Sequence, residues 1–311
     1  MRGSVGNTDF EWYRFLLERQ RQSIAENRTG LEEINFWKPS GGAFSALVPG
    51  EPFFFKLKAP HNVIVGFGFF ARYVVIPDWR AWELFGQANG NPTEESLRRR
   101  TAEYRVRNGG DPHGPIGCIL LSQPVFFEKE RWIAQPSDWS PNIVTTKGYD
   151  LSSGEGHRLW DECMAEARLT VTPQLLDRPA RYGEPILVKP RLGQGTFRAV
   201  VTDVYGACAV TGEHSLPVLE AAHIKPFAKD GPNDIRNGIL LRSDVHRLFD
   251  HGYVTITPDH EFRVSGRLRE DWENGVAYYA MRDRQVNVPS APDLRPSAEL
   301  LQWHNENVFL R

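Results

Sequence analysis

The spacing of apolar residues changes along the chain, and each change predicts a different element. Residues 10–26 place apolar side chains such as Phe10, Tyr13 and Leu17 on or near one side at helical spacing, which predicts an amphipathic helix. Between Ile34 and Val75, short aromatic and β-branched runs alternate with turn signals that contain Pro and Gly. This alternation is typical of a compact β-sheet or barrel.

Helical and extended patterns then alternate in the rest of the first half. A short helix is expected over residues 77–88, and a highly charged helix over 93–107, where an Asn-Gly-Gly turn ends the pattern. Residues 116–127 and 143–151 return to the pattern of strands. We therefore expect a β-barrel with inserted helices, extending from about residue 30 to the end of the last of these strands.

An apolar run in the second half ends in a histidine. The run starts at Leu216 and leads to His223, and Pro226 then closes it, as expected for a strand. Asn237 follows fourteen residues after His223, in a loop rich in Gly, Pro, Asn and Asp. A second apolar run, residues 238–241, supplies a partner strand for a hairpin.

A short helix is expected directly after this hairpin. Ser243 has the chemistry of a helix N-cap, and Asp244 would lie in the first turn. His246 and Asp250 are four residues apart, so both side chains leave the same face of the helix. The order strand, loop, strand, helix therefore brings polar groups together where the elements meet.

These residue types suit the metal-assisted cleavage of a phosphodiester. A neutral imidazole at a rigid strand end, such as His223, is a suitable general base for water. A histidine and a carboxylate one helical turn apart make a partial ligand set that leaves positions for water and a phosphate oxygen. Asn237 cannot act as an acid or base, but its amide can tie the loop to the backbone and orient the base.

Residues from about Ala199 to Arg267 resemble an HNH nuclease of the ββα-metal class, through the motifs AAHI, NGILL and HRLFDHG. The resemblance implies that His223 is the general base, that Asn237 orients it, and that His246 is a catalytic metal ligand. Asp250 stands where a second ligand on the helix would be expected. The implied cofactor is a divalent metal ion, Mg²⁺ or Mn²⁺ or another transition metal.

Two positions depart from the family pattern. Many members carry an acidic or histidine ligand directly before the base, where this chain has Ala222. Glu220 is the nearest acid, but alternation along a strand would point it to the face opposite His223. Cys208 has Thr211 where the second cysteine of a CxxC pair would stand, so no structural zinc is expected.

The first half resembles the PUA superfamily, specifically its SRA and EVE-like domains that read modified bases. The resemblance depends on the segments NFWKPSGGAF, PGEPFFFKL, GFGFF and IGCILLSQPVFF. It implies a pocket for a flipped base, which would be a 5-modified cytosine, enclosed by stacking aromatic rings. Trp37, expected in a loop, is the first candidate for this pocket, and the full candidate set is Phe36, Trp37, Asp78, Trp79 and Trp82.

Composition sets the expected compartment and limits the interaction with DNA. The three cysteines show no paired spacing, and the N-terminal stretch lacks a long apolar region, so we expect a cytoplasmic protein without a signal peptide or membrane span. The net charge of −2 gives no long-range attraction to a polyanion, so any DNA-binding surface must be local. Two basic clusters could supply it, Arg98, Arg99, Arg100, Arg105 and Arg107, and Arg178, Arg181, Lys189, Arg191 and Arg198.

Together these patterns predict an α+β protein with three regions. Residues 1–150 form a modified-base reader, 151–198 a connecting segment, and 199–311 a nuclease domain with a C-terminal tail. The expected function is a modification-dependent endonuclease acting on double-stranded DNA with modified cytosine. One HNH site cuts one strand, so a double-strand break indicates a homodimer, the expected state, or two sequential nicks. Three alternatives stay open: a nuclease without a modification requirement, a binding protein with a weakened nuclease site, and an RNA-directed protein.

Overall fold

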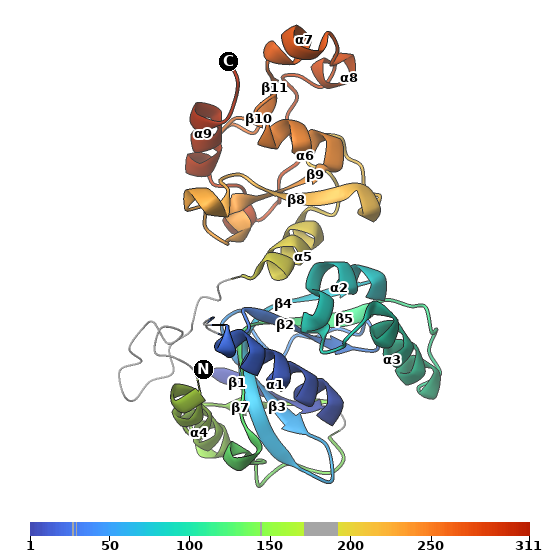
Figure 1. Ribbon diagram of the computed structural model, residues 1–311, viewed down its shortest axis with the longest axis vertical. Coiled ribbons are helices and arrows are strands. Elements are labelled where there is room, and N and C mark those ends of the chain that lie inside the picture. Colours follow the sequence, from blue (N-terminus) through green and yellow to red (C-terminus); the bar gives the residue numbers. More distant parts are fainter. Residues whose placement is uncertain (27, 29, 144, 171–191) are drawn as a thin grey trace. The chain divides into compact units, whose positions relative to one another are not determined.

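The structure is a computed structural model (Figure 1). It describes residues 1–26, 28, 30–143, 145–170 and 192–311. It divides into two compact units, each with its own core: unit 1 is Met1–Thr196 and unit 2 is Phe197–Arg311. Most of the second basic cluster, namely Arg178, Arg181, Lys189 and Arg191, lies outside the described residues, as does part of the expected connecting segment.

Unit 1 is built on one sheet. Within its described residues, the sheet has seven strands in the order β2-β5-β4-β3-β1-β7, with β6 attached to β4. The strands are β1 (Arg2–Thr8), β2 (Glu33–Lys38), β3 (Pro52–Leu57), β4 (Val63–Ile76), β5 (Ile116–Phe126), β6 (Ile133–Ala134) and β7 (Thr146–Asp150). Strands β1 and β3 are parallel, and the remaining recorded pairs are antiparallel. No pairing between β2 and β7 closes this path in the described part of the chain, so the expected barrel is observed as an open sheet.

The helices of unit 1 agree with the helical spacing in the sequence. They are α1 (Phe10–Ala25), α2 (Asp78–Phe85), α3 (Glu94–Arg107) and α4 (Gly154–Thr170), with the short 3₁₀ turns η1 (Gly86–Asn89) and η2 (Lys129–Arg131). The side chain of Asp9 caps α1 by accepting a hydrogen bond from the amide of Glu11, and Thr93 caps α3 in the same way. The three helices predicted before residue 110 are therefore confirmed.

The sheet of unit 1 buries apolar side chains on both faces, in two separate clusters. Figure 1 shows the helices that lie beside the sheet. Phe53 and Phe55 pack with Trp12 of α1, whereas Phe54 packs with Leu159 of α4. This division follows from the alternation of side chains along β3. Helix α4 thus completes the core of unit 1, although the sequence predicted only a connecting segment there, and the boundary between the units falls after Thr196.

Strand β1 was not predicted from the sequence, because its residues are small and polar. Gly3 and Gly6 explain how such a segment can occupy an interior position. A Cβ atom at Gly3 would lie 2.9 Å from the ring of Phe54, and one at Gly6 would lie 2.3 Å from that of Phe53. The absent side chains therefore allow the aromatic rings of β3 to pack against the β1 backbone.

Unit 2 contains the predicted order of strand, loop, strand and helix. Its elements are α5 (Gln194–Tyr205, which begins in unit 1), η4 (Leu216–Val218), β8 (Leu219–His223), η5 (Phe227–Lys229), η6 (Ile235–Asn237), β9 (Gly238–Arg242), α6 (Ser243–Asp250), β10 (Val254–Ile256), β11 (Phe262–Val264), α7 (Arg267–Trp272), α8 (Val276–Tyr279), η7 (Pro292–Leu294) and α9 (Ala298–Asn307). Helix α6 starts one residue earlier than predicted, because Arg242 is the N-cap and Ser243 is the first helical residue. No helix in the described ranges is long and apolar enough to cross a membrane.

The C-terminal helix α9 packs back onto α6. The ring of His304 is 3.7 Å from that of Phe249, with an interplanar angle of 10°. Nδ1 of His304 lies 2.8 Å from Oγ1 of Thr255, and Nε2 lies 3.1 Å from the carbonyl oxygen of Phe249. His304 is buried, and this burial lowers its pKa to about 4, so the ring is neutral and holds α9 in place.

Candidate functional site

Asn237 fixes the loop that joins the two strands of the hairpin. Its side-chain Oδ1 accepts a hydrogen bond from the amide of Lys225 at 2.9 Å. Its Nδ2 donates to the carbonyl oxygens of Lys225 and Pro232, both at 2.9 Å, and its own carbonyl accepts from Ile224. Asn237 is fully buried, so these four bonds satisfy groups that water cannot reach. The loop end next to His223 is therefore held rigidly.

His223 lies at the end of β8, opposite Gly238 of β9. Its ring stacks on Phe197 of α5, with 3.9 Å between the ring centroids and 10° between the planes. A Cβ atom at Gly238 would lie 2.5 Å from the side chain of Val201, so glycine is needed for α5 to approach this closely. Nε2 of His223 is buried and has no hydrogen-bond partner among the described residues. No described protein group therefore engages this ring nitrogen.

The surroundings of His223 favour its neutral form. Burial lowers the pKa of the imidazole, and the electrostatic influence of Arg198 and His246 lowers it further. The amide of Asn233 and the carboxylate of Asp250 act in the opposite direction, and the net change is downward. His223 is therefore unprotonated near pH 7, as a general base must be.

His246 lies between two carboxylates at the start of α6. Its Nδ1 is 2.6 Å from Oε2 of Glu220, and its Nε2 is 3.3 Å from Oδ2 of Asp250. The side chain of His246 is 19% exposed, so the ring is largely shielded from water. Partial desolvation raises the pKa of Asp250, whereas the neighbouring histidines lower it. The structure thus brings His223, His246 and Asp250 into one electrostatically coupled group.

His246 and Asp250 have the spacing of a partial ligand set. Two ligand atoms about 2.1 Å from one cation are roughly 3.0–3.4 Å apart when they subtend an angle between a right angle and the tetrahedral value. The observed 3.3 Å between Nε2 and Oδ2 lies in this range. No group of three or more His, Cys, Asp and Glu side chains that could hold a metal occurs in the described part of the chain.

Glu220 reaches this group, contrary to the expectation that alternation along the strand would keep it away. Helix α6 places His246 within reach of the Glu220 carboxylate, so strand alternation does not exclude this acid from the site. In the sequence, the one indication that Glu220 belongs to the site is its position on the strand that ends in His223. Ala222, at the position of the missing ligand, is fully buried and faces the core. The sulfur of Cys208 accepts hydrogen bonds from the amides of Thr211 and Arg242 at 3.4 and 3.2 Å.

The predicted base-binding residues do not form one pocket wall. Trp37 lies on β2 and not in a loop, so Phe36 and Trp37 point to opposite faces of the sheet. The ring of Phe36 packs in the core against Phe53, 4.8 Å away. Trp37 is half-buried and donates a hydrogen bond from Nε1 to the carbonyl oxygen of Asn89 at 3.1 Å. The ring of Tyr104 is 6.1 Å from that of Trp37.

The other three candidates lie together on α2. Asp78, Trp79 and Trp82 are all partly buried. The Asp78 carboxylate accepts a hydrogen bond from the amide of Trp79 at 2.8 Å, and Arg98 of α3 approaches it at 3.9 Å. Asp78 therefore contributes to the contact between α2 and α3, and its carboxylate is already engaged.

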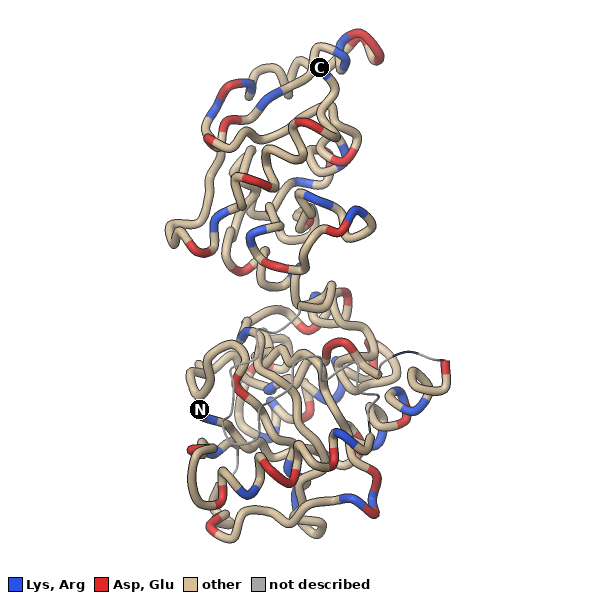
Figure 2. The backbone as a smooth tube through the Cα atoms, turned by 90° about the vertical axis from the view of Figure 1, so that its left-hand side faces the viewer, with Lys and Arg blue, Asp and Glu red and all other residues tan. Residues whose placement is uncertain are grey.

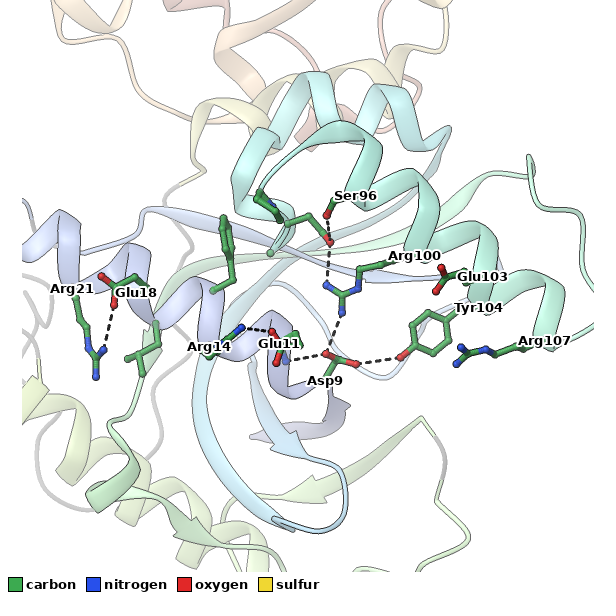
Figure 3. A pocket seen from close by; sticks show the side chains of 15 residues that line it. Asp9, Glu11, Arg14, Glu18, Arg21, Ser96, Arg100, Glu103, Tyr104 and Arg107 are labelled. Carbon is green, nitrogen blue, oxygen red and sulfur yellow. Dashed lines mark hydrogen bonds and ion pairs between the residues drawn. The ribbon is translucent and has the colours of Figure 1, made fainter.

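A cavity of about 770 Å³ opens between α1 and α3 of unit 1 (Figure 3). Asp9 lines it, and its carboxylate pairs with Arg100 at 3.1 Å and accepts a hydrogen bond from Tyr104 at 3.2 Å. Glu11 and Arg14, one turn apart on α1, also line it and pair at 2.5 Å. None of the five predicted base-binding residues lines this cavity, although Trp37 contacts Arg100 and Tyr104 behind its wall.

Charges of both signs are interspersed along the chain (Figure 2), in agreement with the net charge of −2. Within the predicted basic cluster on α3, Arg105 is buried and donates to the carbonyl oxygens of Pro39 and Pro112, both at 2.8 Å. Arg99 and Arg107 are exposed. The cluster therefore has fewer arginines available for phosphate than the sequence indicated.

Residues 208–257 match the family model described as HNH endonuclease, so the chain contains an HNH endonuclease domain. This match supports phosphodiester cleavage, for which such enzymes generally use a divalent metal ion. No curated protein matches the sequence.

Among solved structures, ASCH from Zymomonas mobilis is 12% identical, with a TM-score of 0.33 over 51% of this chain and 94% of that protein. The modification-dependent TagI restriction endonuclease is 13% identical, with a TM-score of 0.28 over 90% of this chain and 78% of that protein. Both TM-scores are below 0.5, so neither likeness defines the fold or function of this chain.

Proposed function

We propose that this protein is a metal-dependent DNA endonuclease whose cleavage depends on modified cytosine in double-stranded DNA. The observation that carries the proposal is the convergence of His223, His246 and Asp250 at the end of the hairpin, within the segment that matches the HNH model. Unit 1 would bind the modified base, and unit 2 would cut the strand. Two copies would act together for a double-strand break, because one such site cuts one strand.

The residues of the hairpin have separate roles in this mechanism. His223 would accept the proton of the attacking water, and its lowered pKa keeps the imidazole in the neutral form that this role needs. Asn237 keeps the backbone beside His223 in place, so the imidazole does not move during proton transfer. His246 and Asp250 would hold a divalent cation, which supplies stabilisation of the negative charge that develops on the phosphate oxygens.

Replacing either His246 or Asp250 with alanine is expected to raise the metal concentration needed for half-maximal cleavage by about 10-fold or more, because each change removes a proposed ligand. The measurement is the cleavage rate of plasmid DNA against Mg²⁺ and Mn²⁺ concentration, and EDTA should stop the reaction. Glu299→Ala, at an exposed acid of α9, is the control and should leave the metal curve unchanged. An Asp250→Ala curve that superimposes on the wild type would remove Asp250 from the ligand set.

The modification requirement is tested on matched plasmids that are unmodified or carry 5-methylcytosine or 5-hydroxymethylcytosine, with an RNA control. We expect cleavage of modified DNA only. Equal cleavage of all plasmids would leave a nuclease without a modification requirement. Binding without any cleavage would indicate a modified-DNA-binding protein, and cleavage of RNA alone would redirect the function to RNA.

Trp37→Ala is expected to weaken binding to modified DNA by about 1–3 kcal/mol, roughly 5- to 150-fold in Kd, if its ring supports the bound base by stacking. Binding to unmodified DNA depends mainly on phosphate contacts and should change little. The measurement is the affinity of the full chain for paired oligonucleotides at one stated salt concentration. Trp272→Ala, at an exposed tryptophan of unit 2, is the control. An equal loss for both oligonucleotides would assign Trp37 a structural role.

A further inference from the structure

Glu220 and Asp250 contact different nitrogen atoms of the same imidazole. Oε2 of Glu220 lies 2.6 Å from Nδ1 of His246, which is the distance of a strong hydrogen bond to a charged acceptor. Oδ2 of Asp250 lies 3.3 Å from Nε2. Glu220 is held in the β8–β9 ladder opposite Leu241, so its backbone cannot move relative to the start of α6 without breaking the hairpin.

We propose that Glu220 is a positioning residue that fixes the tautomer and orientation of His246. A neutral imidazole has one N–H donor and one acceptor nitrogen, and an ionised carboxylate can only accept. The contact with Glu220 therefore keeps a proton on Nδ1, so that Nε2, which faces Asp250, is the nitrogen whose lone pair a divalent cation would take. This inference rests on the proposed function, in which His246 and Asp250 are the ligands.

The geometry distinguishes this role from direct ligation. A cation held by Nε2 and Asp250 lies on the edge of the ring away from Nδ1, whereas the carboxylate of Glu220 is engaged with Nδ1. Glu220 thus acts through His246, in the arrangement of carboxylate, histidine and metal that orients many ligating histidines. Strand β8 thus contributes an acid to the site through Glu220. Ala222, directly before the base, is buried and cannot do so.

The test compares Glu220→Ala with Glu220→Gln, which keeps an oxygen acceptor but removes the charge. Calorimetric titration of the full chain with Mn²⁺, without DNA, gives the metal affinity. Nitrogen-15 NMR of the imidazole rings, without metal and at a pH where His246 is neutral, gives the tautomer of His246. We expect Glu220→Ala to weaken Mn²⁺ binding by about 10- to 100-fold and to shift the proton away from Nδ1. Glu220→Gln should stay within about threefold of wild type with the tautomer kept.

The matched control is Glu299→Ala, which should leave both the Mn²⁺ affinity and the tautomer unchanged. Wild-type affinity and tautomer in Glu220→Ala would overturn the proposal. So would a loss in Glu220→Gln as large as in Glu220→Ala with the tautomer kept, because the charge would then act directly on the metal. Both measurements are independent of cleavage, so a protein that binds Mn²⁺ as described but cuts no DNA would contradict only the proposed function.

Discussion

Replacing His223 with alanine is expected to reduce DNA cleavage by at least about 10²-fold, which corresponds to about 2.7 kcal/mol in the activation barrier. The imidazole is the proposed acceptor of the water proton, and its lowered pKa keeps it neutral near pH 7. DNA binding should change little, because one neutral ring contributes little to the phosphate contacts that dominate affinity. Single-turnover cleavage at saturating metal measures the effect.

His214→Ala is the matched control, since His214 is an exposed histidine of the same unit. Its cleavage rate should equal that of the wild type. A His223→Ala rate within about tenfold of wild type would mean that another group accepts the proton. DNA affinity measured in parallel shows whether a loss of rate comes from the chemical step.

Acidification is expected to loosen the packing of α9 on α6, with a loss of about 3 kcal/mol between pH 6.5 and 4. The pKa of buried His304 is lowered to about 4, whereas the unfolded chain binds the proton near pH 6.5. The unfolded state therefore binds more protons in this window, and stability falls as the pH decreases. Hydrogen exchange of Ala298–Asn307, corrected for intrinsic exchange rates at each pH, measures the change.

His304→Phe separates titration from packing. The phenyl ring can keep the stack on Phe249 but cannot titrate or replace the hydrogen bonds to Thr255 and Phe249, so protection should be lower at pH 7 and nearly independent of pH. His214→Ala should keep the wild-type pH dependence. An equally steep loss in His304→Phe would place the responsible proton on another group.

The hairpin of unit 2 could be predicted because one short segment contains both its polar site residues and the apolar pattern that defines its strands. His223 ends an apolar run, and the spacing of His246 and Asp250 is that of one helical turn, so strand and helix follow directly from the pattern. Asn237 was placed correctly in the loop that it holds. Its exact partners required coordinates, because they are backbone groups.

Features that depend on packing between distant segments could not be predicted from local sequence patterns. The contact between Glu220 and His246 could not be predicted, because alternation describes a single strand and not the helix that packs near it. Phe36 was assigned to a pocket although it packs with Phe53 in the core, since aromatic residues have the same sequence signal in both settings. Helix α4 has the amphipathic spacing of a core helix, but its Leu159 was overlooked within a segment interpreted as a connection.

The pairing of β1 has a consequence for how the two units fold. Its register joins Arg2 to Asp150, so the sheet of unit 1 closes a very long loop before this pair contributes any stability. The hairpin of unit 2 joins segments that are near in sequence, such as His223 and Gly238. Folding rates fall as contacts become less local. The nuclease hairpin therefore has the topology of the faster-folding element, and the sheet of unit 1 that of the slower one.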